Sequence, residues 1–281
     1  MREKNQWLTF HYDGAGRITS QRLATDSGLT PLTRETLQMS FDTNSYPQLY
    51  PSPASQILTQ HVYDRYPTTM PAALAFEEIP DMTCDLTGCD PETLLDTLTT
   101  GLPTYEKLTA ITDSSIGGEY HRAYYYDYKG REIQRVECDF EGNILRTTSR
   151  YDLIGNLLAQ RESYTHGGTT DVLDRAFKYD SRNRMTKETA QFNDGEQAVV
   201  AYTYDDLGQL IGKTYGTGAH AIHETMDYNM QGWLTEKSSE LFEMRLRYHD
   251  PESHLSDRAS YTGNISSWWW KHRLINNDND S

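Results

Sequence analysis

The sequence predicts an all-β fold that is built from tandem antiparallel β-hairpins. Three observations support this prediction: the aromatic residues are mostly tyrosine, segments after residue 118 alternate with period two, and a tyrosine–aspartate motif repeats. The chain has 281 residues, with 20 tyrosines against 7 phenylalanines and 5 tryptophans. Tyrosine favours strands and combines an apolar ring with a polar tip. We therefore expect half-exposed β-surface rather than a thick aliphatic core.

Alternating hydrophobicity marks individual strands. A period of two is typical of strands with one buried face. Two runs show it clearly, with Phe242, Met244, Leu246 and Tyr248 on one face of the first, and Ala198, Val200, Tyr202 and Tyr204 on one face of the second.

The repeated motif is Tyr, then Asp or Asn, two free positions, and then Gly or Asn. The six copies are Tyr12, Asp13 and Gly16; Tyr126, Asp127 and Gly130; Tyr151, Asp152 and Gly155; Tyr179, Asp180 and Asn183; Tyr204, Asp205 and Gly208; and Tyr228, Asn229 and Gly232. The last five tyrosines follow one another at intervals of 25, 28, 25 and 24 residues. Such a period indicates a repeat architecture.

The spacing within the motif predicts a hairpin turn. Asp or Asn at the first position and Gly three residues later favour a type I turn, in which the Asp side chain accepts backbone N–H bonds. A left-handed residue after that turn completes a common three-residue hairpin loop, so we expect positive φ at Gly130, Gly155, Gly208 and Gly232. Second turn signals at 141–143, 166–168, 193–195 and 216–218 give each repeat two antiparallel strands.

Proline separates the first copy from the others. Nine of the ten prolines lie between Pro31 and Pro103, and proline cannot donate to a sheet ladder. We expect a partial repeat at 1–20, a Pro-rich irregular insert at 21–118, the main repeat region at 119–265, and a truncated repeat or linker at 266–281. Within the insert we expect one short helix, with Asp90 as N-cap, Pro91 at its first position and Gly101 as its end. Its apolar side would hold Leu94, Leu95 and Leu98.

The motif copies resemble the YD repeats of bacterial Rhs proteins, teneurins and insecticidal toxin complexes. The resemblance rests on Tyr126-Asp127 with Gly130 and on Tyr204-Asp205 with Gly208, and it covers residues 119–248 and the copy at Tyr12. In that family the repeats form a β-sheet that curls into a hollow shell. Bacterial members, including polymorphic toxins, can enclose a toxic C-terminal domain, and animal members act in cell adhesion. The resemblance thus implies a segment of a larger β-shell, with flanking repeats of the same polypeptide as partners.

Both ends of the chain favour a fragment of a longer protein. The run from Arg247 to Glu252 resembles the RYYDPETG sequence of many Rhs cores, but it lacks the Gly, and no toxin domain follows it. No signal peptide follows Met1, and no run approaches the roughly 18 apolar residues that a membrane span needs. We expect the parent protein to be secreted or displayed at the cell surface.

Charge excludes some partners. The formal net charge is −15, and this negative field repels phosphate backbones and anionic membranes. We expect neither nucleic-acid binding nor a membrane span.

Two groups of residues are candidates for a metal site. His220, His223 and Glu224 lie in a turn region with no further ligand placed by the sequence, and we interpret them as an exposed turn. The acidic residues around Cys84 and Cys89 do not follow the alternating spacing of a calcium loop; these are Asp81, Asp85 and Asp90. The two cysteines form a small disulfide loop or stay free thiols. We expect no metal and no cofactor.

Trp268 and Trp270 are the only candidates for ligand contact, and they are weak ones. On a strand they share one face, with Trp269 on the other. Paired tryptophans fill a sheet face or stack on sugar rings.

These observations favour a non-enzymatic structural segment that encloses a cargo or presents a surface. No catalytic motif is present: the sequence has no Gly-x-Ser-x-Gly elbow, phosphate loop or HExxH. The alternative is an adhesive or carbohydrate-binding module that uses exposed Tyr and Trp. An encapsulated toxin domain or a surface glycan would be the partner in the two cases.

Overall fold

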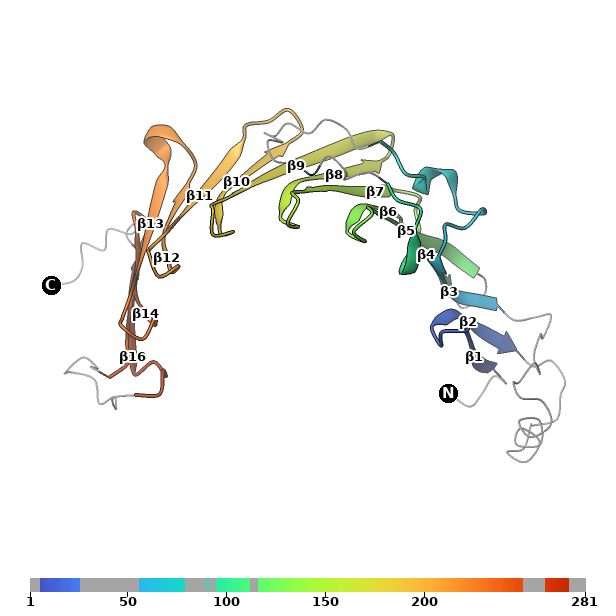
Figure 1. Cartoon of the computed structure of the whole chain (residues 1–281), viewed down its shortest axis with the longest axis horizontal. Helices are drawn as coiled ribbons and strands as arrows, with labels where there is room; N and C mark the ends of the chain where they lie inside the picture. The colour runs from blue at the N-terminus through green and yellow to red at the C-terminus, as the bar shows by residue number, and fades with distance from the viewer. Residues whose placement is uncertain are drawn as a thin grey trace. The chain divides into compact units, whose positions relative to one another are not determined.

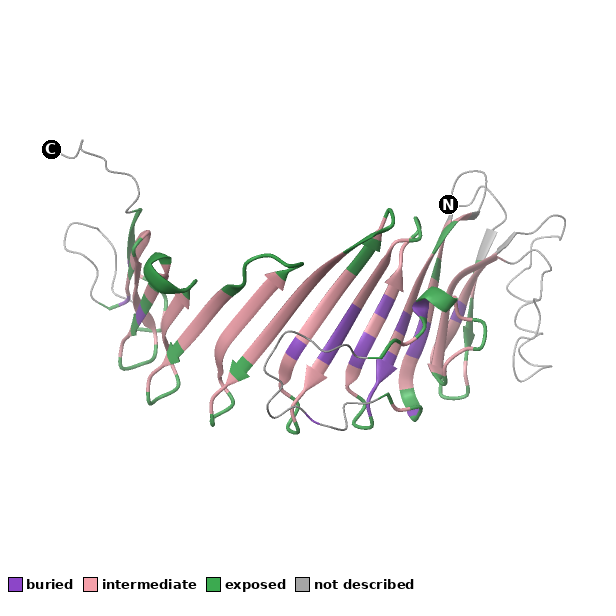
Figure 2. Cartoon of the chain, turned by 90° about the horizontal axis from the view of Figure 1, so that it is seen from above, coloured by how far each residue is buried: buried purple, intermediate pink, exposed green. Residues whose placement is uncertain are grey.

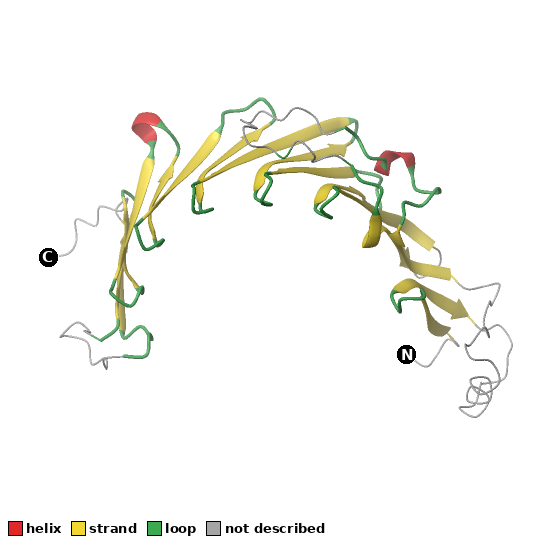
Figure 3. Cartoon of the chain, viewed as in Figure 1, coloured by secondary structure: helices red, strands yellow, loops and turns green. Residues whose placement is uncertain are grey.

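The computed structural model describes residues 6–25, 56–78, 90, 95–111, 116–249 and 261–272. These residues form sixteen β-strands and two 3-10 helices of three residues each, η1 and η2 (Figure 1). The predicted all-β class is confirmed (Figure 3). None of the helices within the described residues is long and apolar enough to cross a membrane.

The chain divides into two compact units. The first comprises Met1–Asp81, Cys89–Arg150 and Arg161–Val172, and the second comprises Met82–Gly88, Tyr151–Gln160 and Leu173–Ser281. Each unit is a meander, in which strands that follow one another along the chain pair antiparallel.

The first unit holds seven strands in chain order. They are β1 (Gln6–Tyr12), β2 (Ile18–Thr25), β3 (Gln56–Asp64), β4 (Thr99–Ile111), β5 (Ile116–Tyr126), β6 (Glu132–Cys138) and β7 (Ile144–Tyr151). Each pairs antiparallel with the next. The helix η1 (Ala72–Leu74) follows β3.

The second unit continues the same pattern. Three strands carry residues of both units: β7, whose last residue Tyr151 belongs to the second unit, and the strands β8 (Leu157–His166) and β9 (Thr169–Tyr179). The others are β10 (Met185–Phe192), β11 (Ala198–Tyr204), β12 (Leu210–Tyr215), β13 (Ile222–Tyr228), β14 (Leu234–Ser239), β15 (Phe242–Arg247) and β16 (Ser267–His272), with η2 (Gly218–His220) before β13. From β9 to β16 each strand pairs antiparallel with the next.

The prediction of an irregular insert at 21–118 is wrong for most of the residues that the structure describes there. The strands β3 and β4 run through it, and they pair antiparallel from Thr59↔Leu108 to Asp64↔Thr99. Pro103 lies inside β4, at a shift in register opposite Tyr63. A bulge is one of the few places where a sheet accepts proline, so proline density did not exclude strands here.

The predicted short helix is also wrong where the structure describes it. Leu95 and Leu98 lie in non-helical backbone, Asp96 forms an isolated bridge with Tyr126, and β4 starts at Thr99. Gly101 has a φ of +86° within β4. Pro91 and Leu94 lie outside the described residues.

The buried residues of the first unit lie mainly on β4 to β7, as Figure 2 shows in purple. Leu74 of η1 is fully buried, and its carbonyl accepts a 2.7 Å hydrogen bond from the Tyr125 hydroxyl. The rings of Tyr66 and Phe76 lie against Tyr125, with centroids 5.1 and 5.3 Å away. The segment after β3 therefore covers one face of β5.

Polar side chains hold the end of that covering segment. Gln134 of β6 accepts a 3.0 Å bond from the Glu77 backbone N–H and donates a 3.1 Å bond to the Glu77 carbonyl. Arg146 of β7 donates to the carbonyl of Ala75 at 3.0 Å and pairs with the Glu77 carboxylate at 2.7 Å. Desolvation by burial lowers the pKa of Arg146. These bonds satisfy polar groups that would be costly to bury unpaired.

Candidate functional site at the tyrosine–aspartate turns

The motif turns are closed by a common set of hydrogen bonds, of which the turn at Asp127 shows all. At Asp127 the backbone N–H donates to the Arg131 carbonyl at 3.0 Å, and the Gly130 N–H donates to the Asp127 carbonyl at 2.9 Å. The Asp127 carboxylate accepts the backbone N–H groups of Lys129 and Arg131, both at 2.9 Å. In the other predicted copies too, the backbone N–H of the fourth residue after the Asp or Asn donates to its side-chain oxygen. The acceptors are Asp13, Asp152, Asp180, Asp205 and Asn229.

The backbone at the last turn position is left-handed, as predicted. Gly130, Gly155, Gly208 and Gly232 have φ of +74°, +100°, +90° and +79°. Gly16 has +78°, and Asn183 reaches +65°. Glycine carries no penalty there, and Asn tolerates it better than most residues. The register of the strand pairing shifts beside the turn. As a result the motif tyrosine pairs with the sixth residue after it, as in Tyr204↔Leu210.

The fourth residue after the Asp adds a side-chain contact in four of the tyrosine turns. Arg131 Nε donates to Asp127 Oδ2 at 2.6 Å, and Asn156 Nδ2 donates to Asp152 Oδ2 at 2.7 Å. Hydrogen bonds to a carboxylate favour its charged form. The backbone N–H of Arg184 accordingly holds the pKa of Asp180 below its usual value, with smaller contributions from the guanidinium.

A turn with the same bonds occurs at Asp139, where Cys138 replaces tyrosine. The Asp139 carboxylate accepts the backbone N–H groups of Glu141 and Asn143 at 2.9 Å, and Gly142 has a φ of +86°. The side-chain amide of Asn143 is the largest cause of a lowered pKa at Asp139. The sequence identified residues 141–143 as a turn but not as a copy of the Asp motif.

The motif tyrosines connect successive repeats through their hydroxyl groups. Five such hydroxyls donate to backbone carbonyls at 2.7–3.0 Å: Tyr126 to Pro103, Tyr179 to Leu157, Tyr204 to Met185, Tyr228 to Leu210, and Tyr248 to Leu234. Four of the acceptor residues lie six residues after the motif tyrosine of the preceding repeat. This is the position that pairs with that tyrosine, as Met185 pairs with Tyr179. We call these five bonds the tyrosine tethers.

Tyr248 belongs to this series, although the sequence did not place it in the motif. Its side chain is 6% exposed, its ring lies 5.0 Å from that of Trp233, and burial raises the pKa of its hydroxyl. Burial likewise raises the pKa of Tyr126 and of Tyr179.

Tyr63 and Asp64 form a further copy of the motif, in which a long stretch of chain separates the Asp from its glycine, Gly101. Tyr63 pairs with Pro103, whose carbonyl accepts the Tyr126 tether. Asp64 Oδ1 accepts the Gly101 N–H at 2.6 Å, as the motif Asp accepts N–H groups elsewhere. The motif search missed this copy because no Gly or Asn stands three residues after Asp64; the Tyr-Asp dipeptide at the end of an alternating run was its only signal.

The arginines after two turns confirm the equivalence. Arg17 lies 4.4 Å over the ring of Tyr63, and Arg184 lies 4.6 Å over the ring of Tyr204. In both cases the arginine follows one turn and its cation–π partner is the tyrosine of the next turn. Arg17 also bonds the carboxylate of Asp64, and Arg184 bonds the carbonyl of Asp205 at 3.3 Å.

Asp90, predicted as a helix N-cap, contacts the turn at Asp127, and the residues that follow it, 91–94, lie outside the described part of the chain. Its carboxylate is fully buried and lies 2.9 Å from both Lys129 Nζ and Arg131 Nη2. Arg131 is thus shared between Asp90 and Asp127.

The weak ligand candidates Trp268 and Trp270 lie on β16, as expected for alternate strand positions. They are 62% and 47% exposed. They pair with Leu246 and Met244, and the Trp270 ring lies 6.3 Å from that of Phe242. Trp269, on the other face, lies 5.7 Å from the Arg245 guanidinium.

The candidate metal ligands form no metal site within the described part of the chain. His220 lies in η2, and His223 lies in β13 with its Nδ1 3.2 Å from the Thr214 hydroxyl. The described residues contain no group of three His, Cys, Asp or Glu side chains suited to a metal ion. Asp81, Cys84, Asp85 and Cys89 lie outside them. Cys138 is a free thiol whose pKa is raised by burial.

Comparison with known proteins finds similarity among solved structures but not among sequences. No protein-family model matches the sequence, and no curated protein matches it. The structure is similar to part of the solved crystal structure of TcdB2-TccC3-TEV, with 14% sequence identity and a TM-score of 0.41. That likeness covers 86% of this chain, whereas this chain spans only 11% of the length of the other.

Proposed function

We propose that this chain is a non-enzymatic structural segment of a larger Rhs-type shell or surface protein. The observation that carries the proposal is the series of tyrosine tethers. Each tether fixes one repeat to the preceding one through a backbone carbonyl, which any residue can supply. An array linked in this way is extended by adding repeats, which is the property that a wall requires.

The positions of the charged side chains support the same proposal. The side chains of Asp127 and Arg131 bond to groups of the turn itself. The YD-repeat resemblance of the sequence adds an enclosed toxic domain as the cargo, flanking repeats as the main partners, and an extracellular or cell-surface location for the parent protein.

The natural full-length polypeptide that contains these residues tests this proposal. Electron cryomicroscopy of that polypeptide should show tethered repeats continuing on both sides of this segment around an enclosed volume. An added protease should leave any enclosed domain intact until the sheet is denatured. A natural polypeptide that forms no closed wall, or whose further domains are cleaved at once, would contradict the shell.

The second candidate function is adhesion through glycans, and the exposure of Trp268 and Trp270 favours it. Tryptophan faces stack on sugar rings, and these two share one strand face. A glycan array should then give signals that the Trp268→Ala and Trp270→Ala variants lose. The matched control is Phe192→Ala, since Phe192 is an aromatic residue that is 56% exposed on another strand.

A further inference from the structure

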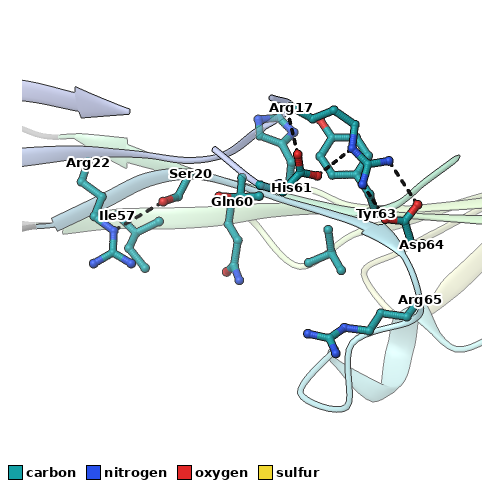
Figure 4. A pocket seen from close by; sticks show the side chains of 12 residues that line it. Arg17, Ser20, Arg22, Ile57, Gln60, His61, Tyr63, Asp64 and Arg65 are labelled. Carbon is teal, nitrogen blue, oxygen red and sulfur yellow. Dashed lines mark hydrogen bonds and ion pairs between the residues drawn. The ribbon is translucent and has the colours of Figure 1, made fainter. Parts of the chain in front are cut away.

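An open cavity of about 530 Å³ lies between β2 and β3 in the first unit (Figure 4). The two strands pair from Leu23↔Gln56 to Ser20↔Gln60, and no further pairs join them toward their turns. Beyond Ser20 the strand β2 pairs with β1, and beyond Gln60 the strand β3 pairs with β4. The cavity occupies the place where the pairing stops, and its size is within the range for small-molecule sites.

One of the three arginines that line the cavity is already neutralised. Arg17 Nε lies 2.6 Å from Asp13 Oδ2, and Arg17 Nη1 lies 3.1 Å from Asp64 Oδ1. Its guanidinium also covers the Tyr63 ring. These contacts hold Arg17 across the cavity as part of the repeat framework, so that its charge is balanced without a ligand.

The other two arginines, Arg22 and Arg65, have no carboxylate partner among the residues that the structure describes. Arg22 Nε has only the Ser20 hydroxyl, at 3.5 Å. Figure 4 shows the side chains of Arg22, Gln60 and Arg65 extending to the same side of the strands. The remaining basic side chain, His61, has its Nδ1 3.5 Å from the Glu106 carboxylate.

Several other arginines of this acidic chain do pair with carboxylates. The sequence has 41 acidic residues against 26 Lys and Arg, and Arg122 pairs with Glu137 and Arg146 with Glu77. Two unpaired guanidiniums on one cavity leave their forked donors available for an external anion. Guanidinium matches a carboxylate in bidentate geometry.

We infer that this cavity binds an acidic saccharide, with carboxylates at Arg22 and Arg65 and sugar hydroxyls between them. The side chains of Thr19, Ser20 and Gln60 line the space with neutral donors and acceptors, which suit hydroxyl groups. Ile57 adds an apolar contact for the face of a sugar ring. The two guanidiniums stand at separate positions on the strands, so they fit a ligand with two anionic groups rather than one small ion. This inference is independent of the proposed shell.

The test is binding of trigalacturonate to the immobilised chain, measured by biolayer interferometry beside the methyl ester of the same trisaccharide. The acid should bind at least about tenfold more tightly than its neutral ester. Arg22→Gln and Arg65→Gln should each weaken binding of the acid at least about tenfold. Arg175→Gln is the charge-matched control, because it removes one positive charge on β9, outside the cavity, and it should bind as the parent chain does.

Circular dichroism melts of the variants serve as the check that each variant retains the fold. Equal binding of acid and ester, unchanged binding by both cavity variants, or no binding at millimolar trigalacturonate would each overturn the inference. Inorganic sulfate that binds as tightly as trigalacturonate would overturn the assignment to a saccharide. None of these outcomes bears on the shell, which is tested on the full-length polypeptide.

Discussion

The hydroxyl of Tyr204 donates a 2.8 Å hydrogen bond to the carbonyl of Met185, the residue paired with the tyrosine of the preceding repeat. This bond joins two turns that are separate in sequence and adjacent in the sheet. Since the same relationship recurs in five tethers, it gives the repeat a physical definition beyond its sequence motif.

Removing one tether should weaken the sheet. Tyr204→Phe keeps the ring under Arg184 but leaves the Met185 carbonyl without its hydroxyl donor, and we expect a loss of about 1 kcal/mol in the free energy of unfolding. Tyr215→Phe is the control, because that hydroxyl belongs to a side chain 38% exposed and its bond to Glu224 is long, at 3.4 Å. Urea titration compares the two; equal midpoints would contradict a structural role for the tether.

A substitution at the left-handed turn position should be costly even where space is open. A Cβ at Gly16 meets nothing within 4 Å, yet its φ is +78°. We expect Gly16→Ala to destabilise the first hairpin by about 1 kcal/mol. Gly14→Ala, in the same turn and equally open, should change stability by less than about 0.5 kcal/mol. Amide hydrogen exchange on β1 and β2 measures both, and equal effects would refute the turn assignment.

The turn carboxylates should make the protein sensitive to acid. The backbone N–H of Arg184 lowers the pKa of Asp180 in the folded state. A lowered folded-state pKa contributes stability that is present above the unfolded value of about 3.9 and is lost as the pH falls through the folded pKa.

Asp180→Asn should therefore reduce the fall in stability below about pH 4. The amide can still accept the backbone N–H bonds, as Asn229 does in its own turn. Asp206→Asn, at an exposed turn position, should leave the pH profile unchanged. Urea midpoints measured from about pH 5 to about pH 2 distinguish the two variants. A steeper acid transition in Asp180→Asn than in the parent chain would contradict this assignment.

Metal removal should have no effect on folding. The sequence offers no complete ligand set, with His220 and His223 as its nearest approach. We expect the melting temperature to be the same in excess EDTA and in its absence. A fall of several degrees that zinc or calcium restores would show that a ligand set had been overlooked.

The sequence predicted the repeated turns well because their geometry depends on side chains that few residues can replace. The positive φ at Gly130 and Gly208 follows from the Asp-to-Gly spacing alone. The strand alternation of Phe242 and Met244 was equally predictable, since it depends on period two.

The tethers and the copy at Tyr63 and Asp64 could not be predicted in the same way. A tether acceptor is a backbone carbonyl, which every residue has, so Met185 or Leu210 carries no mark in the sequence. Tyr63 and Asp64 have the roles of a motif copy, but Gly101 follows Asp64 by 37 residues, so the motif spacing is absent from the sequence. Proline density in this region then favoured an irregular segment over the strands that are present.

The terminal strands allow a test of the central claim, that this chain is one segment of a larger array. Within the described residues β1 pairs only with β2 and β16 only with β15. Both strands carry exposed apolar side chains, with Phe10 44% and Trp268 62% exposed. Unpaired sheet edges and exposed aromatic residues promote association. The net charge of −15 opposes it, but salt screens that repulsion beyond about 8 Å.

Light scattering on the purified chain at micromolar concentration and physiological salt tests this claim most directly. The account predicts self-association that decreases when two or three natural flanking repeats are added at each end. A monodisperse monomer that unfolds in one cooperative transition would contradict it, because such a chain would be a complete domain rather than a segment of a wall.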